Sequence, residues 1–226
     1  NDYLNVTIGA AGTHQASDLT GVETVKATFS AAGTLSLLGS AGVTHVKAAG
    51  STAAAAVTNI PLAASLEVEN SAQNATFTYK ATDISGSADA ATLTLNNVTT
   101  GSTVSVAGIE TLNVVSGGGG NVLTALTVAD ASTVNITGAQ SLDLGAANTT
   151  SELIDGSAVT AALTIITDNA NAATVKTGSG ADSITSTGGT ATIVTIESGA
   201  GDDTITHTAN LGSTDVINGG DGTDTL

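Results

Sequence analysis

One spacing constrains this chain more than any other feature: three short motifs near its C-terminal end repeat in phase every 21 residues. They read GSGADSI from Gly178, GAGDDTI from Gly199 and GDGTDTL from Gly220. In each motif an Asp follows the second Gly by two positions, and a large apolar residue follows that Asp by two more. A repeat of this length predicts a solenoid, because one repeat buries its apolar residues only by stacking on the next.

A second apolar series with the same period predicts a second strand in each coil. Val175, Ile196 and Ile217 are also 21 residues apart. We expect Ile154 and Leu163 to extend the two series one coil upstream, Leu142 to extend one of them again, and Ile184, Ile205 and Leu226 to stack inward. Parallel strands in neighbouring coils would lie roughly 4.8 Å apart, which brings the motif turns into one column.

The turn residues indicate what this column could bind. Glycine permits positive φ and close backbone approach, so carbonyl and carboxylate oxygens can converge between neighbouring turns. Hard oxygen ligands suit Ca²⁺ better than a transition metal. Residues 178–226 also contain seven acidic residues and no Lys or Arg, so a bound cation would relieve their repulsion.

The sequence before the motifs predicts strands of a less regular kind. Loosely related segments begin at Gly21, Gly42, Gly108 and Gly138, with uneven gaps between the later ones. Alternating Val or Leu with polar residues is typical of strands, and the run Gly117–Gly120 predicts a loop or hinge. We therefore expect an all-β chain with little helix: an irregular β-solenoid-like region over 1–150 and a β-roll over 151–226. The chain has no initiator Met and stops inside a repeat, so we expect it to be part of a longer protein.

Charge and composition exclude several functions. The chain has 20 acidic residues and four Lys, for a net charge of -16, which disfavours nucleic acid and anionic membrane partners. It has no Cys and no apolar run long enough to span a membrane. Disorder is the competing interpretation of a chain rich in Gly, Thr, Ser and Ala, but the in-phase apolar series argue against it. No HExxH motif, nucleophile elbow or phosphate loop is present, and the three His residues are scattered, so we expect no enzyme activity.

The three motifs resemble the calcium-binding β-roll of RTX (repeats-in-toxin) proteins, over about residues 178–226. The Cys-free, acidic, Ala/Thr/Gly/Val-rich remainder is similar in composition to RTX-bearing bacterial surface-layer proteins of the Caulobacter type. The resemblance implies secretion by a type I route and folding in extracellular calcium. It implies carboxylate ligands at Asp182, Asp203 and Asp224, with carbonyl ligands from the turns that hold Gly178, Gly180, Gly199, Gly201, Gly220 and Gly222.

The motifs depart from the family pattern in two ways. A usual β-roll has a shorter coil with a motif in both turns, whereas each coil here carries one motif, so we expect one calcium column. Thr177 and Ser198 replace the first Gly of two copies. Four other Asp residues are weaker ligand candidates, because they stand at variable positions or in upstream turns: Asp202, Asp221, Asp155 and Asp168.

The expected function is that of a structural component of a secreted bacterial surface layer. Its expected partners are further copies of itself in a two-dimensional lattice, and cell-surface polysaccharide held by parts outside this sequence. One alternative is an RTX adhesin segment that binds glycan or ice, since pairs such as Thr185/Thr187 and Thr206/Thr208 could form a flat threonine array. Another is the C-terminal β-roll of a secreted hydrolase. Glycan binding by the isolated chain would indicate the adhesin, and a catalytic motif in adjoining sequence would indicate the hydrolase.

Overall fold

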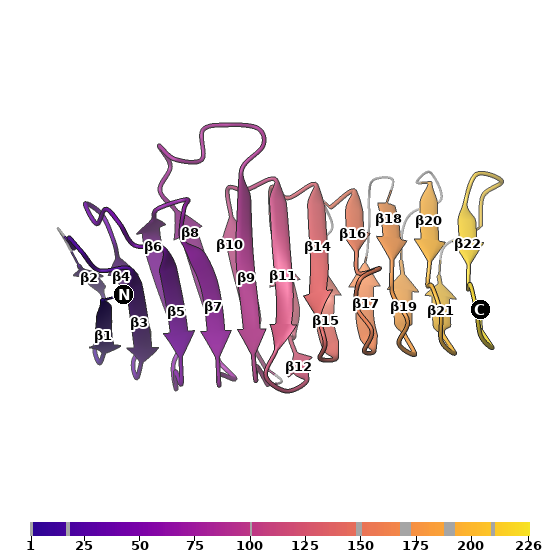
Figure 1. The fold of residues 1–226 in the computed structure, drawn as a ribbon, viewed down its shortest axis with the longest axis horizontal. Coiled ribbons are helices and arrows are strands. Elements are labelled where there is room, and N and C mark those ends of the chain that lie inside the picture. The colour runs from indigo at the N-terminus through magenta and orange to yellow at the C-terminus, as the bar shows by residue number, and fades with distance from the viewer. Residues whose placement is uncertain are drawn as a thin grey trace.

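The computed structural model describes residues 2–16, 19–99, 101–147, 151–167, 173–187, 193–208 and 211–226. Over these residues the chain is a parallel β-solenoid, which confirms the expected all-β class (Figure 1). The chain passes alternately between two sheets that face each other, so successive strands of one sheet belong to successive coils. The two termini lie at opposite ends of the stack (Figure 1). No described segment forms a helix with the length and apolarity that a membrane crossing needs.

Two parallel sheets, here named sheet A and sheet B, account for all the described strands. The strands of sheet A, in spatial order, are β1 (Tyr3–Ile8), β3 (Thr24–Phe29), β5 (His45–Ala49), β7 (Ser65–Glu69), β9 (Ala90–Asn96), β11 (Thr111–Gly117), β14 (Thr133–Gly138), β16 (Leu153–Asp155), β18 (Ala173–Lys176), β20 (Val194–Glu197) and β22 (Val216–Asn218). Those of sheet B are β2 (Thr13–Gln15), β4 (Gly33–Ser36), β6 (Ala55–Ile60), β8 (Ala75–Tyr79), β10 (Thr103–Ala107), β13 (Ala125–Thr127), β15 (Leu142–Ala147), β17 (Leu163–Thr167), β19 (Ser183–Ser186) and β21 (Thr204–His207), with β12 (Asn121–Val122) pairing β15 beside this path.

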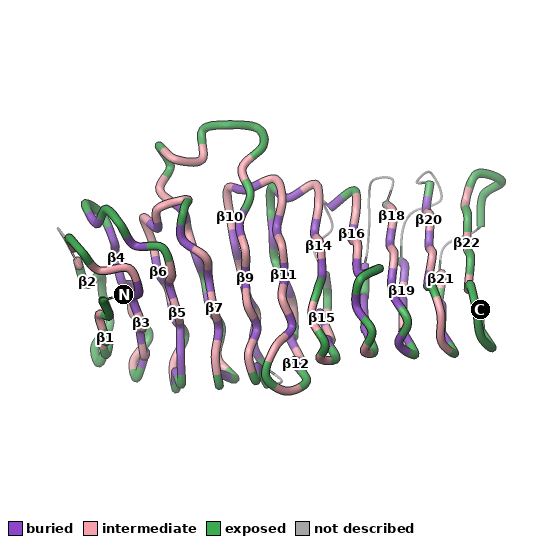
Figure 2. The backbone as a smooth tube through the Cα atoms, viewed as in Figure 1, coloured by how far each residue is buried: buried purple, intermediate pink, exposed green. Residues whose placement is uncertain are grey.

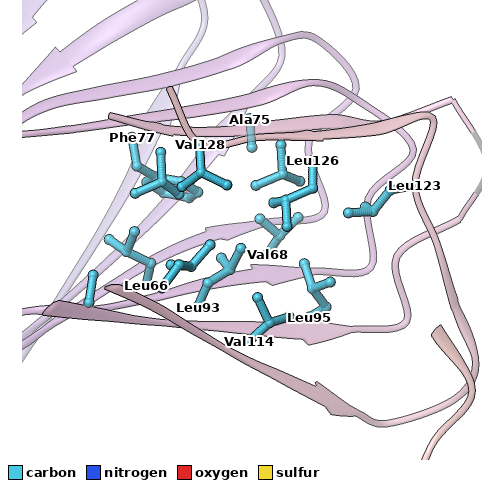
Figure 3. Packing of buried hydrophobic residues seen from close by; sticks show 14 of the residues in the cluster. Leu66, Val68, Ala75, Phe77, Leu93, Leu95, Val114, Leu123, Leu126 and Val128 are labelled. Carbon is cyan, nitrogen blue, oxygen red and sulfur yellow. The ribbon is translucent and has the colours of Figure 1, made fainter. Parts of the chain in front are cut away.

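The core lies between the two sheets and follows from the period-two pattern of each strand. Buried residues alternate with more exposed ones along the strands (Figure 2). In β9 the buried residues are Ala91, Leu93 and Leu95. The inward residues of sheet A, such as Leu93, face those of sheet B, such as Phe77 (Figure 3). Thin layers of Val, Leu, Ile and Ala therefore fill most of the core.

The apolar series predicted from the sequence is confirmed on sheet A and needs a correction on sheet B. On sheet A, Ile154, Val175, Ile196 and Ile217 are direct partners in register. On sheet B, Ile184 pairs Ile205 as expected.

The place predicted for Leu163 is wrong, because Ile165 is the partner of Ile184. Leu163 lies two positions before Ile165 in β17, where it pairs with Leu142 and stands opposite Asp182. The step from Ile165 to Ile184 is shorter than the next step, from Ile184 to Ile205, so the period of the motifs is interrupted at this coil. One coil further upstream, Leu142 and Leu163 pair in register with the period that was expected. Leu226 was expected to stack inward, but it is 72% exposed in the terminal coil.

Several irregularities lie in the coils before β16. Residues 80–89 project beyond the coils between β8 and β9 (Figure 1), and register shifts interrupt the β6–β8 and β15–β17 pairs. The glycine run at 117–120 is the bend between β11 and β12. Both sheets nevertheless continue past residue 150, since β14 pairs β16 and β15 pairs β17.

Candidate metal centre

The three motifs lie in turns of one kind, which lead from a sheet A strand to the next sheet B strand. We call these connections the first turns, and the connections from sheet B back to sheet A the second turns. The first turns stack directly: Ala200 N donates to Gly178 O (2.8 Å), and Asp221 N donates to Gly199 O (2.9 Å). The structure thus brings residues 178–182, 199–203 and 220–224 into one column.

The glycines of these turns are required by the close approach of neighbouring coils. A Cβ atom at Gly199 would overlap the carbonyl oxygen of Gly178, and one at Gly220 would overlap that of Gly199. The second glycines behave alike, since a Cβ at Gly201 would overlap Gly180 O. Gly199 and Gly201 also have φ angles of +93° and +125°, which L-residues rarely adopt. Backbone oxygens therefore pack against bare Cα atoms along the column.

Each motif Asp ties its coil to the one before it. Asp182 Oδ1 accepts the backbone N–H of Leu163 (2.7 Å), Asp203 Oδ1 accepts that of Asp182 (2.8 Å), and Asp224 Oδ1 accepts that of Asp203 (3.1 Å). The first two side chains belong to residues only 2% exposed. A hydrogen bond from a backbone N–H to a carboxylate is charge-assisted and therefore stronger than one between neutral groups.

The other oxygen of the two buried carboxylates has no partner. Asp182 Oδ2 and Asp203 Oδ2 are buried without a hydrogen bond among the described residues. Burial raises the pKa of Asp182 above its ordinary value, and the charge of Asp203 adds to that. The Leu163 N–H opposes this rise, as do the nearby Thr177 hydroxyl and Gly178 N–H, although neither of these two makes a hydrogen bond of good geometry to Oδ2. Removing a charged oxygen from water without a partner is costly, so a cation close to these two atoms would lower that cost.

The remaining acidic candidates differ in position from the buried pair. Asp224 and Asp221 are exposed in the terminal coil. Asp202 is exposed and accepts Thr223 N one coil downstream (2.9 Å). Asp155 accepts the backbone N–H and the hydroxyl of Ser157, which together lower its pKa. Asp168 lies outside the described residues.

The two substitutions of the first motif Gly have a structural role that the sequence did not reveal. Thr177 Oγ1 donates to Ser198 O (2.8 Å), and Ser198 Oγ donates to Gly219 O (2.8 Å). Both hydroxyls are buried, and each links its coil to the next one downstream. These hydroxyl groups thus reach the next coil, whereas the Asp side chains reach the preceding one.

In one upstream first turn, a neutral amide side chain donates hydrogen bonds to the oxygen atoms that converge there. Asn121 is 1% exposed, and its Nδ2 donates to Leu95 O (3.2 Å), Ser116 Oγ (2.8 Å), Gly117 O (3.1 Å) and Gly119 O (3.1 Å). Its Oδ1 accepts Val98 N (2.9 Å). A polar N–H₂ group therefore sits among converging oxygens. Sequence reasoning missed this residue, because a single Asn in a Gly-rich loop carries no distinctive signal.

The motif turns fit a hard divalent cation such as Ca²⁺. Ca²⁺ prefers carboxylate and carbonyl oxygens as ligands, and both are present in these turns. Two buried carboxylate oxygens lack hydrogen-bond partners among the described residues, and the glycines let carbonyl oxygens of neighbouring turns come close together. Within the described ranges, no three Asp, Glu or His side chains gather closely enough to hold a metal by themselves. A cation here would therefore draw much of its coordination from backbone carbonyls.

Comparison with protein-family models, with curated proteins and with solved structures found no match to this chain.

Proposed function

We propose that this chain is a structural module whose C-terminal coils are stabilised by Ca²⁺. The observation that carries the proposal is the pair of buried carboxylate oxygens without partners, Asp182 Oδ2 and Asp203 Oδ2. Asp182, Asp203 and the carbonyls of the neighbouring glycine turns would hold the ion. When bound, it would supply positive charge to a buried acidic column that contains no Lys or Arg.

The calcium dependence belongs to the last coils and not to the whole solenoid. The upstream first turn that holds Asn121 is closed by a neutral amide, and the core of the upstream coils contains the large side chains Phe29, Phe77 and Tyr79. Removing calcium should therefore loosen residues 173–226 and leave the preceding coils folded. Ion binding to the folded form alone adds about 2.7 kcal/mol per independent site at a calcium concentration 100 times Kd.

The biological setting follows from the resemblance of the motifs to RTX repeats and stays a proposal. The module would be a secreted component of a bacterial surface layer, folded by extracellular calcium and associated with further copies of itself. The -16 charge and the parallel solenoid are compatible with this setting. A glycan- or ice-binding adhesin segment and the tail of a secreted hydrolase remain the alternatives.

Hydrogen exchange of the full chain, in chelator and in millimolar calcium, tests the proposal directly. We expect calcium to slow exchange of backbone amides in β18 to β22 strongly and to leave β5 to β11 nearly unchanged. Isothermal titration should show calcium binding that Asp203→Asn weakens. The matched control is Asp143→Asn, since Asp143 is an acidic residue of sheet B outside the motif turns. Equal protection of β18 to β22 in both conditions, in protein verified as calcium-free, would refute the proposal.

A further inference from the structure

The outer face of sheet B is almost uncharged, although the chain carries a net charge of -16. Outward side chains on its strands are mostly Thr, Ser and Ala, and the one acidic residue among those described is Asp143, whose Oδ1 accepts Gly145 N (2.8 Å). The outer face of sheet A differs, because it carries Lys47, Glu67 and Glu69 in an ion-pair network and Lys176 paired with Glu197. Apart from Asp143, the described charges of the molecule thus lie on sheet A and in the turns.

The uncharged face has a hollow at one end and a projection toward the other. Small residues around β4 and β6, among them Gly33, Ala54 and Ala56, line an open groove of about 460 Å³. Ile166 on β17 is an outward residue of the same face and is 39% exposed. A large apolar side chain and an unfilled groove therefore share one face, five strands apart in sheet B.

Both features lie on one register column of the sheet. Along sheet B, Thr103 pairs with Ala125, Ala125 pairs with Ala146, and Ala146 pairs with Ile166. The pairs Ala55–Ala75 and Ala75–Val104 extend this register by one residue to Ala54, Asn74 and Thr103. Ala54 and Ile166 thus stand at the same height along their strands, separated by roughly 24 Å at about 4.8 Å per strand.

We propose that the outer face of sheet B binds the same face of a second copy of this chain, about a two-fold axis that runs parallel to the strands between β10 and β13. Rotation about this axis places β17 of one copy over β6 of the other, and each residue keeps its position along the strand direction. It places Ile166 of one copy over Ala54 of the other, inside the groove. Ala146 then lies over Asn74, and Ala125 lies over Thr103.

Charge and area both favour a second copy as the occupant. Two molecules of net charge -16 repel through their acidic turns and sheet A faces, whereas their sheet B faces can approach without that cost. Small side chains near the axis, such as Thr103, Ser105 and Ala125, permit close sheet packing. A face about 48 Å long and 12 Å wide would bury roughly 1,200 Å² in total, the lower limit for a specific stable interface.

Cysteine cross-linking tests the geometry, because the chain contains no Cys. Ala54→Cys and Ile166→Cys should each stay unlinked alone and form a disulfide dimer when the two single variants are mixed under mild oxidation. An intramolecular bond is excluded, because each variant contains a single Cys. The control mixture pairs Ala54→Cys with Thr94→Cys on the outer face of sheet A and should give no dimer. Cross-linking of the control as efficiently as of the test mixture would overturn the proposal.

The association itself is measured by sedimentation of the full chain. We expect a dimer whose affinity rises with salt, because salt screens the repulsion between the two net charges. The dimer affinity should be at least tenfold lower in Ser105→Lys and unchanged in Thr94→Lys. The strands from β6 to β17, which carry the contact of Ile166 with Ala54, lie upstream of Asp182, so a dimer should persist in chelator, weakened only by the loss of contacts from β19 and β21. Dimers that form without calcium, in a protein that also fails to bind calcium, would overturn the metal proposal and leave this inference standing. A strict monomer at high salt and concentration would overturn this inference. So would a monomer that sediments with a crystalline neutral polysaccharide, since that would assign the face to glycan.

Discussion

The carboxylate of Asp203 accepts a hydrogen bond from the backbone N–H of Asp182, one coil upstream, at 2.8 Å, while its second oxygen is buried without a partner. The two oxygens therefore have different roles. One joins neighbouring coils and needs only an acceptor. The other carries charge that a cation would neutralise. Substitutions at this one residue can separate the two roles.

Replacing Asp203 by Asn should keep the bond to Asp182 and remove the charge. In chelator we expect Asp203→Asn to be at least as stable as the wild type, because no buried charge is left unpaired. Asp203→Ala should be less stable by about 1–3 kcal/mol, because the Asp182 N–H loses its acceptor. In calcium both variants should lose stability relative to the wild type. Urea unfolding with and without chelator measures these differences, and a chelated Asp203→Asn as unstable as Asp203→Ala would contradict the separation of roles.

Replacing Gly201 by Ala should destabilise the C-terminal coils in any buffer. The new Cβ would overlap the carbonyl oxygen of Gly180, and the φ angle of +125° is unfavourable for Ala, so we expect a loss of roughly 3 kcal/mol. The control is Gly212→Ala, where the nearest atom to a new Cβ is Asp215 Oδ2 at 3.5 Å. Thermal unfolding in calcium compares the two. Similar melting temperatures would show that the first turns are not packed as closely as described.

Replacing Asn121 by Ala should destabilise the upstream coils independently of calcium. The change leaves the buried Val98 N–H without its acceptor and removes the donor of four oxygens, so we expect a loss of about 2–4 kcal/mol. Asn113→Ala removes a half-buried amide from the outer face of sheet A and should cost less than about 1 kcal/mol. Urea unfolding in chelator reports both. A calcium-dependent effect at Asn121 would count against its role as a neutral closure.

Acid should weaken the ion-pair network on sheet A. Burial alone would raise the pKa of Glu67, but hydrogen bonds from Lys47, Asn96 and His45 outweigh it and lower that pKa below its ordinary value of 4.5. A lowered folded-state pKa means that this stabilisation is present above 4.5 and is lost as the pH falls through the folded-state value.

Glu67→Gln should therefore lower the urea midpoint near pH 7 and flatten the part of the acid loss that lies below pH 4.5. Glu197→Gln is the comparison, because Glu197 is 45% exposed in its pair with Lys176 and should have a smaller effect. An acid profile of Glu67→Gln that parallels that of the wild type would contradict this assignment.

The solenoid and the motif column could be predicted from the sequence because both rest on periodicity, which stacking preserves. Leu163 was misplaced, since an arithmetic period cannot show that the coil between Ile165 and Ile184 is shorter than the one that follows it. Asp182 and Asp203 were predicted to be calcium ligands in the turns, but not to be acceptors of N–H groups from the preceding coil. That relationship depends on register across two coils. The hydrogen bonds of the Thr177 and Ser198 hydroxyls were missed for the same reason, because a Thr or Ser in place of a motif Gly does not show which coil its hydroxyl contacts.

The one-way direction of the Asp bonds has a consequence for how such a molecule can change in length. Asp182, Asp203 and Asp224 each serve only the coil before them, and Thr177 and Ser198 each serve only the coil after. A 21-residue unit is therefore an interchangeable module with one kind of joint at each side. Duplicating residues 178–198 in frame would add a coil whose joints match those already present. The number of coils, and with it the length of the rod, can thus vary without redesign of these first-turn hydrogen bonds.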